Sequence, residues 1–435
     1  TPLDADGVPD DFFTRDIDQA LLEGRADLAV HSAKDLPEQP VDGLYTAALL
    51  PVHEPRDALV IRPGLPSDAT PASVGTSSPR RVEEMQARFP DIEARPVRGD
   101  IRARLRQLDE GRFDALIVAA CALQRLGLEE RIHQFLDYDP APNQGRLALV
   151  IRAGDRELAR TLAPLDVRRH AGLVALLGCP ADPWLLPERT RRYLDAADVI
   201  LHDRLVPERV LAPYADKLEA VGKAGGHPSM AQSEIHRRML LHAEGGAMVA
   251  RVHGGDPGVF GHLAEELEFL HAWGLRTDVI PAVTAAQAAA ARAQAPLTDR
   301  THGRQVTFIS GHVPPDQAQD VPGPAEGHLA VYMGVANRET WIERLKSAGW
   351  PEETTVTLGE RIGYPDEHIR HLGLGELAGT EIGTPAVMLA GPSPFGPAPP
   401  TLFPGTNPEA FLRHGPILHW PLIELQNRPL AKRRE

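Results

Sequence analysis

The stretch GLVALLGCPADPWLL, residues 172–186, joins an apolar run to a glycine and then to a proline-bounded turn. A short apolar run that stops at a turn is typical of a strand buried on both faces of a sheet. RTRRYLDAA (189–197) then has the pattern of a helix, and DVILHDRL (198–205) that of a second strand. Strand, helix and strand in this order predict an α/β domain that starts near residue 172.

Cys179 lies in that turn, where a cysteine can hold a covalent group, bind a metal or fill a small space in a loop. The chain has only two cysteines, and the other, Cys121, is distant in sequence with no CxxC spacing. This spacing argues against a disulfide framework and against a structural zinc site. The apolar context VAACALQRLG predicts that Cys121 is a buried small side chain.

The alternation of strand and helix continues on both sides of the opening stretch. Upstream, five strand-like runs alternate with helical segments and predict an α/β domain with a largely parallel sheet. These runs are DLAVHSAK, DALVIR, SVGTSS, DALIVAA and LALVIRAG. Downstream, the proline- and glycine-rich segment 313–327 reads as a linker before a further α/β unit. We place a boundary near residues 166–172.

Composition and charge limit the classes of function. The chain has 435 residues and a formal net charge of -14, which argues against nucleic-acid binding. No apolar run approaches the length of a membrane span, and the acidic start TPLDADGVPDD lacks a signal-peptide pattern. With the sparse cysteines, these features predict a cytoplasmic protein without nucleic-acid or membrane partners.

An arginine-rich segment at 75–106 suits a bidentate grip on carboxylates or phosphates, although charge counting alone favours a solvated helix face. The motifs around this segment are more specific evidence than the arginines alone. HSAKDLP, PRDALV, GTSSPRR, VRGDIRARLRQLDEG and AACALQRLGLEERI follow one another in the order of the porphobilinogen deaminase (hydroxymethylbilane synthase) family, which residues 1–166 resemble. The resemblance implies a truncated, periplasmic-binding-protein-like region with an incomplete first domain, a second domain at about 57–140 and no third domain.

The deaminase resemblance also implies residue roles. Asp35 would steady the cationic intermediate, since a carboxylate stabilises developing positive charge. Arg80, Arg81, Arg98 and Arg104 would hold the acetate and propionate arms of the pyrroles. The family's third domain bears the cysteine that holds the dipyrromethane primer, and APLDVRRH runs directly into GLVALLG here. We therefore expect no dipyrromethane and a vestigial hydroxymethylbilane synthase region.

The second region contains the glycine motif ARVHGGDPGVFG at 250–261, which alone is only weak evidence for a ligand loop. Together with DVILHDRLVPERVL, VGKAGGHPSMAQSEIHRRM, VIPAVTAAQAAAARAQAPLTDR, ISGH and VYMGVAN, it resembles the uroporphyrinogen-III C-methyltransferases, which are tetrapyrrole methylases. The resemblance implies a two-lobed α/β methylase with lobes at 167–305 and 306–392. It also implies S-adenosylmethionine as methyl donor, a tetrapyrrole substrate and a homodimer.

The methylase resemblance assigns candidate site residues, and GCPADP matches the family's donor loop, so that Cys179 reads as loop filler. Asp203 would accept a proton and Lys223 would donate one; the simpler alternatives are an ion pair with Arg204 and an exposed loop charge. The candidates for the donor site are Pro180, Gly254, Gly255, Asp256, Val259, Thr284, Ala285 and Met333. The candidates for gripping substrate carboxylates are Arg204, His227 and Arg300. No metal is required.

Residues 393–435 read as a proline-rich linker and the start of a uroporphyrinogen-III synthase-like domain. The sequence as a whole predicts a fusion protein of tetrapyrrole biosynthesis that methylates uroporphyrinogen III to precorrin-2, on the way to sirohaem or cobalamin. The alternative is a catalytically decayed protein that still binds or scaffolds tetrapyrroles.

Overall fold

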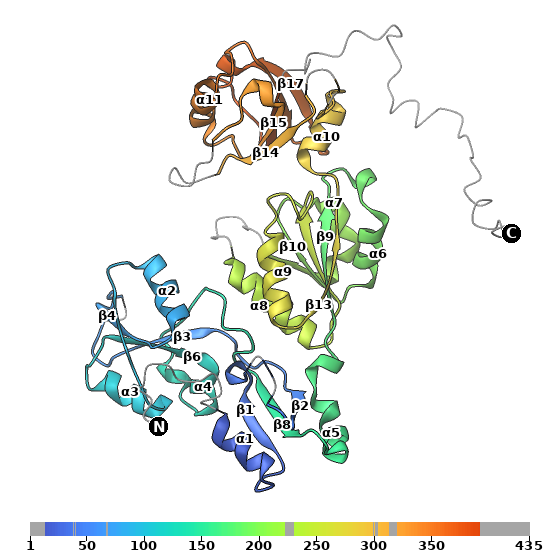
Figure 1. The fold of residues 1–435 in the computed structure, drawn as a ribbon. Coiled ribbons are helices and arrows are strands. Elements are labelled where there is room, and N and C mark those ends of the chain that lie inside the picture. The colour runs from blue at the N-terminus through green and yellow to red at the C-terminus, as the bar shows by residue number, and fades with distance from the viewer. Residues whose placement is uncertain are drawn as a thin grey trace, which may run out of the picture. The chain divides into compact units, whose positions relative to one another are not determined.

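The computed structural model describes residues 14–37, 39, 41–66, 68–221, 230–298, 300, 303–312 and 320–391 (Figure 1). Its described residues fall into two compact units. Among these residues, the first unit comprises those up to Ala288 with Glu360–His368 and Ile382–Val387, and the second comprises those within Ala289–Gly359 and Ile369–Glu381 and those from Met388 to Gly391. Each unit is an assembly of α/β sheets and helices, as the sequence predicts. The tail at 393–435, with its proposed synthase-like start, lies outside the described residues.

The first sheet has three strands in the order β1-β8-β2, and both pairings are antiparallel. The strands are β1 (Ala29–Ser32), β8 (Leu147–Arg152) and β2 (Leu44–Leu49). Two helices accompany them, α1 (Arg15–Leu22) and α5 (Arg156–Leu162). Leu21 of α1 packs with Ala29, Ala148 and Val150 of the sheet, which fixes the helix on one face.

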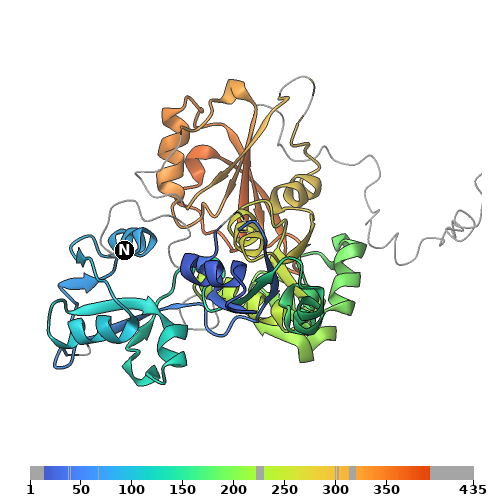
Figure 2. The same cartoon turned by 60° about the horizontal axis from the view of Figure 1, so that its bottom comes forward.

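The second sheet has five strands in the order β5-β4-β6-β3-β7, the light blue to cyan lobe at the left of Figure 2. The strands are β5 (Glu93–Arg95), β4 (Ser73–Gly75), β6 (Ala115–Ala119), β3 (Asp57–Ile61) and β7 (Gln134–Phe135). The helices are α2 (Pro79–Arg88), α3 (Ile101–Asp109) and α4 (Ala120–Arg125). Leu105 and Leu108 of α3 pack on Leu116 and Val118 of β6.

The prediction of a largely parallel sheet in this first part of the chain is wrong. The first sheet has only antiparallel pairs, and in the second β3 runs antiparallel to both β6 and β7. Only the pairs β4–β5 and β4–β6 are parallel. The reason is topological: β8 inserts between β1 and β2 after about a hundred intervening residues, so no short helical crossover fixes its direction.

The third sheet has five strands in the order β11-β10-β12-β9-β13, and every pairing is parallel. The strands are β11 (Leu218–Ala220), β10 (Val199–His202), β12 (Val249–Gly254), β9 (Leu173–Cys179) and β13 (Arg276–Ile280). The helices are α6 (Glu188–Ala196), α7 (Glu208–Leu211), α8 (Gln232–Glu244), α9 (Leu263–Ala272) and α10 (Ala285–Arg292). The opening run of the sequence analysis is therefore β9, a central strand.

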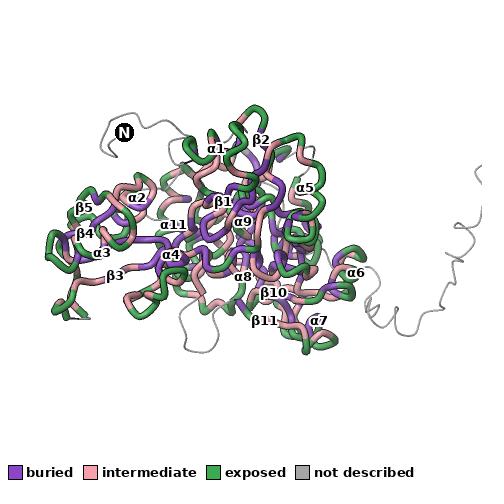
Figure 3. Tube along the Cα trace, turned by 90° about the horizontal axis from the view of Figure 1, so that it is seen from below, coloured by how far each residue is buried: buried purple, intermediate pink, exposed green. Residues whose placement is uncertain are grey.

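Alternate residues of β9 serve two hydrophobic cores, because side chains of a strand point to opposite faces in turn. Val174 and Leu176 pack with residues of α8 and α9, whereas Ala175 and Leu177 pack with Leu194 of α6. Helices thus cover both faces (Figure 1). Burial follows the strands in purple, while α6 shows green along its outer side (Figure 3).

The chain leaves β9 toward β10 on one side and leaves β12 toward β13 on the other, although β9 and β12 are neighbours. This reversal is a topological switch point, the place where open parallel sheets bind ligands beyond the carboxyl ends of their strands.

The last sheet has the order β14-β15-β18-β16-β17. Its strands are β14 (Val306–Ser310), β15 (His328–Tyr332), β18 (Ala386–Ala390), β16 (Thr355–Glu360) and β17 (His368–Gly373), and α11 (Arg338–Ser347) accompanies them. Trp341, Ile342 and Leu345 of α11 are buried. None of the helices in the described ranges combines the length and apolar character needed to cross a bilayer.

Within the first unit, the antiparallel sheets and the third sheet meet at a buried junction. Glu244, at the end of α8, forms an ion pair with Arg146 and accepts a hydrogen bond from the Val52 N–H at 2.7 Å. The Arg146 guanidinium also lies 5.4 Å from the ring centroid of Trp273. Val52 belongs to the same hydrophobic core as Val174, so the two regions share packed interior.

Candidate functional site

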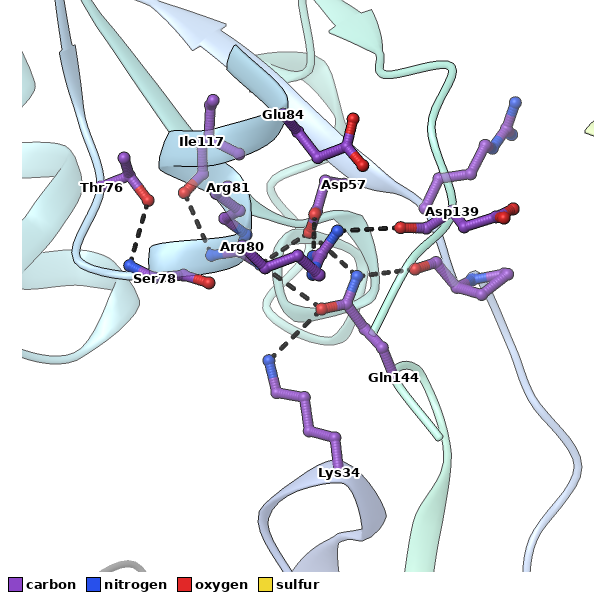
Figure 4. A network of polar contacts seen from close by, with 12 residues as sticks. Lys34, Asp57, Thr76, Ser78, Arg80, Arg81, Glu84, Ile117, Asp139 and Gln144 are labelled. Carbon is purple, nitrogen blue, oxygen red and sulfur yellow. Dashed lines mark hydrogen bonds and ion pairs between the residues drawn. The ribbon is translucent and has the colours of Figure 1, made fainter. Parts of the chain in front are cut away.

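A cluster of basic side chains gathers where α2 begins (Figure 4). Pro79 occupies the first turn of the helix, a position that suits its fixed φ, and Arg80 and Arg81 follow directly. Arg80 Nη2 donates to Asp57 Oδ2 at 2.5 Å and Arg81 Nη2 to Asp57 Oδ1 at 2.6 Å. The Gln144 amide donates to the same carboxylate at 2.9 Å. Both arginines are therefore held in place by one buried acid.

Asp57 stays ionised in this setting. Burial raises its pKa, but the charges and hydrogen bonds of Arg81 and Arg80 outweigh burial and hold the pKa below its ordinary value. Arg81 is only 7% exposed. Its guanidinium contacts Asp57, and little of the side chain reaches solvent. The sequence assigned both arginines to ligand carboxylates and missed this internal partner.

The other predicted cations lie in the same neighbourhood. Burial, followed by the charges of Arg81 and Arg98, lowers the pKa of Arg104, whose Nε donates to the Gly99 carbonyl at 2.7 Å. Burial, followed by Arg81, also lowers the pKa of Lys34. The charges of Arg81 and Arg98 thus act on Arg104, and that of Arg81 acts on Lys34, so these cations form one cluster.

Asp35 lies beside Lys34 in the single turn that follows β1. Burial raises the pKa of Asp35 above its ordinary value, while Lys34 opposes the shift. The structure thus places the predicted carboxylate next to Lys34, at the edge of the basic cluster, and its role toward a cationic intermediate remains a prediction.

The second set of candidate residues lies at the carboxyl end of the parallel sheet. Cys179 ends β9 and is fully buried, with Leu177 and Ala250 in one core. Burial raises the pKa of its thiol to about 12. A thiol of this kind is a poor nucleophile and a poor metal ligand, because both roles need the thiolate. The geometry supports Cys179 as loop filler.

The glycine loop after β12 lies against the end of β9. The Gly255 N–H donates to the Cys179 carbonyl at 2.7 Å, and Gly255 has a φ of 86°, in the left-handed region that favours glycine. A Cβ on Gly254 would lie 2.6 Å from the Cβ of Leu205, whereas a Cβ on Gly255 would meet nothing closer than the Thr284 Cα at 4.0 Å. Gly254 is required for packing, and Gly255 leaves open space at the switch point.

Asp256 joins two loops at this end of the sheet. Its Oδ1 accepts from the Gly258 N–H at 2.8 Å, and its Oδ2 accepts from the Ala282 N–H at 2.8 Å. The loops after β12 and β13 are therefore fixed relative to each other. Thr284 and Ala285 follow at the start of α10, and Val259 is half-buried in the glycine loop.

Side-chain hydrogen bonds brace the loop that follows β9. Arg209 Nη2 donates to the Ala181 carbonyl at 2.7 Å and also to the carbonyl of Gly363. The Tyr364 hydroxyl donates to the Leu205 carbonyl at 3.2 Å. Pro180 is thereby presented beside the glycine loop. Met333, the remaining donor-site candidate, belongs to the second unit, where it has a φ of 55° and is 51% exposed.

Asp203 follows β10, and its partner differs from the one that the sequence suggested. Arg251 Nη1, on β12, lies 2.7 Å from Asp203 Oδ1, while Arg204 is exposed. Asp203 remains 32% exposed above the buried Arg251. The sequence reading missed Arg251, although an arginine inside the apolar strand MVARVHGG was a visible signal. Lys223 and His227 lie outside the described residues, and Arg300 is exposed in the second unit.

No group of three or more His, Cys, Asp or Glu side chains in the described ranges is arranged to hold a metal.

Comparison with known proteins finds matches for both regions of the chain. Residues 4–160 match the family "Porphobilinogen deaminase, dipyromethane cofactor binding domain", and residues 175–378 match "Tetrapyrrole (Corrin/Porphyrin) Methylases". The porphobilinogen deaminase of Chromobacterium violaceum is 46% identical over 159 residues, 35% of this chain and 52% of that protein. That of Thiobacillus denitrificans is 45% identical over 240 residues, 48% of this chain and 78% of that protein.

Among solved structures, the uroporphyrin-III C-methyltransferase of Thermus thermophilus is 36% identical, with a TM-score of 0.45, and the match covers 51% of this chain and 97% of that one. The same enzyme has been solved in complex with S-adenosyl homocysteine. The chain spans about half the length of the curated deaminases that it matches first.

The fold defines a tandem α/β protein. The chain belongs to the porphobilinogen deaminase family through its first region, and residues 175–378 match the tetrapyrrole methylase family model.

Proposed function

We propose that this protein transfers methyl groups from S-adenosylmethionine to uroporphyrinogen III and yields precorrin-2. The observation that supports this most strongly is the open space at Gly255, at the switch point between β9 and β12. Pro180, Gly254, Gly255, Asp256, Val259, Thr284 and Ala285 would hold the donor; the assignment of Met333, in the second unit, remains a prediction. When bound, the donor supplies an electrophilic methyl group on a sulfonium.

The chain's own residues would align the reactants and manage a proton. Asp256 fixes the loops on which Gly255 and Thr284 lie, so its contribution to donor binding is the shape of that surface. Asp203 is the candidate acceptor for the proton that leaves the methylated pyrrole carbon, and Lys223 the candidate donor. Arg204, His227 and Arg300 are the candidates for the substrate's carboxylates.

The first region would bind anionic pyrroles without a covalent primer. A dipyrromethane group held through a thioether needs a reactive cysteine, and the chain has only Cys121 and Cys179. Both are buried, and burial raises the pKa of both thiols. Neither fits a covalent attachment, so we propose that this region lacks hydroxymethylbilane synthase activity. The gathering of Lys34, Arg81, Arg98 and Arg104 in one cluster favours retention of pyrrole binding.

Calorimetric titration with S-adenosyl homocysteine tests the proposal, with Asp256→Ala as the loop variant. We expect micromolar binding by the wild-type chain, a loss of about tenfold or more in the variant, and methyl transfer to uroporphyrinogen III in a subsequent assay. Absence of binding by the wild-type chain would leave the pyrrole-binding scaffold as the better account. The cytoplasmic location, the homodimer and the domain boundaries remain predictions.

A further inference from the structure

Asp203 contacts a network of buried charged side chains. The parallel pairing of β10 with β12 places Leu201 beside Arg251, and Asp203 lies just beyond the end of β10. Arg251 Nη1 lies 2.7 Å from Asp203 Oδ1, and Arg251 Nε donates to Glu266 Oε1 at 2.9 Å. The Glu266 side chain, on α9, is 0% exposed and that of Arg251 is 3% exposed. One guanidinium thus joins a fully buried carboxylate to a carboxylate that reaches solvent.

Glu266 is itself fixed by two further side chains. The Gln232 amide, on α8, donates to Glu266 Oε1 at 3.1 Å, and His253 Nε2 lies 3.0 Å from Glu266 Oε2. His253 Nδ1 lies 3.7 Å from Asp203 Oδ2. The basic side chains that face Glu266 are therefore Arg251 and His253, and both also face Asp203. Because α8, α9 and β12 each contribute to the network, Glu266 has little freedom to move.

The planar guanidinium explains how Glu266 acts at a distance. Arg251 uses its Nε edge on Glu266 and its Nη1 on Asp203, so that fixing one edge fixes the direction of the other. Without Glu266, the Arg251 guanidinium can rotate, and the Asp203 carboxylate that it contacts can shift as well. A displacement of about 1 Å of a reacting group costs on the order of 100-fold in rate.

We propose that Glu266 is a positioning residue that sets the orientation of Asp203 for methyl transfer, acting through Arg251. This inference rests on the proposed function, since it concerns the proton-accepting step assigned to Asp203. The alternative is that Glu266 only neutralises the buried charge of Arg251 and stabilises the fold. The two readings differ in one respect: a positioning role vanishes once Asp203 can no longer accept a proton.

A double-mutant cycle in the full chain separates them. The variants are Asp203→Asn, Glu266→Gln and the two combined, with Glu265→Gln as a matched control. Glu265 is the adjacent carboxylate of α9, with a side chain 58% exposed. For each protein, kcat and KM are measured with S-adenosylmethionine and uroporphyrinogen III, and the affinity for S-adenosyl homocysteine is measured by calorimetry.

We expect Glu266→Gln to lower kcat by tenfold or more, with KM for the donor and the affinity for S-adenosyl homocysteine within twofold of wild type. In the Asp203→Asn background, adding Glu266→Gln should change kcat less than twofold, because groups that act as a unit are non-additive. Glu265→Gln should match wild type. A full loss that persists in the Asp203→Asn background would overturn the positioning role.

Arg251→Lys is a second variant, for use if Glu266→Gln does not fold. It keeps the buried positive charge but removes the planar guanidinium that contacts both carboxylates. It should therefore lower kcat on its own and have no further effect on kcat when combined with Asp203→Asn. If Arg251→Lys lowers kcat by the same factor with and without Asp203→Asn, the positioning role of Glu266 is refuted as well. If the wild-type chain binds S-adenosyl homocysteine but transfers no methyl group, the proposed function fails and this role fails with it, an outcome distinct from an active enzyme with additive losses.

Discussion

Replacing Glu244 with alanine tests the junction between the two regions of the first unit. Glu244 forms an ion pair with Arg146, and their side chains are 3% and 2% exposed. Removing one partner of a buried pair leaves an uncompensated charge, which costs about 3–5 kcal/mol. The Val52 N–H, now at 2.7 Å from Glu244 Oε2, would also lose its acceptor, at about 1–3 kcal/mol. We expect the free energy of unfolding to fall by about 4 kcal/mol or more.

Urea denaturation followed by tryptophan fluorescence measures this loss, because Trp273 lies against Arg146 at the junction. Glu265→Ala is the matched control, since its exposed carboxylate lies on the next helix and its removal should change stability by less than about 0.5 kcal/mol. Glu244→Gln keeps an acceptor for Val52 and should lose less than the alanine variant. A change below about 1 kcal/mol for Glu244→Ala would refute the argument that this pair holds the junction.

Three further outcomes are expected. Gly255→Ala should lower the affinity for S-adenosyl homocysteine by about tenfold, because the new methyl group enters the open space and strains a φ of 86°; calorimetry measures it. Iodoacetamide at pH 8 should leave Cys179 unmodified in the native chain, whose thiol has a pKa of about 12, and modify it in urea, as mass spectrometry would show. Burial raises the pKa of Glu266, but its contacts with His253 and Arg251 outweigh burial and lower that pKa from 4.5 to about 2. The stability that the Glu266 charge contributes is therefore present above pH 4.5 and is lost as the pH falls toward 2. In the Glu266→Gln variant, the free energy of unfolding should depend less on pH between 4.5 and 2.

Strong local patterns in the sequence predicted the central strands of the fold. The apolar run 173–179 is β9, and the runs that contain Val199 and Val249 are β10 and β12. Short or polar strands were missed. β11 has only the residues Leu218–Ala220 and no alternation to reveal it, and β2 follows a glycine turn in a stretch of small residues. The strand directions of the first region were also wrong, because direction depends on pairing between distant segments.

The candidate sites were predicted as residues but not as partnerships. Asp57 stands in the quoted motif PRDALV but was not singled out, and only the fold shows that it joins Arg80 and Arg81. An ion pair with Arg204 was the simpler alternative considered for Asp203, whereas strand register supplies Arg251 from about fifty residues away. Such pairings follow from three-dimensional packing, which spacing along one chain does not encode.

The shared interior at Val52 means that the two regions are not interchangeable modules. A chain cut near residue 170 would leave the core around Trp273 without Val52 and would leave Glu244 buried without Arg146. Amide protons of α8 and of the segment around Val52 should then exchange with deuterium in one cooperative opening in the intact chain. The core of the methylase-like region is therefore completed by a residue of the deaminase-like region, so that a cut between the two regions should destabilise both.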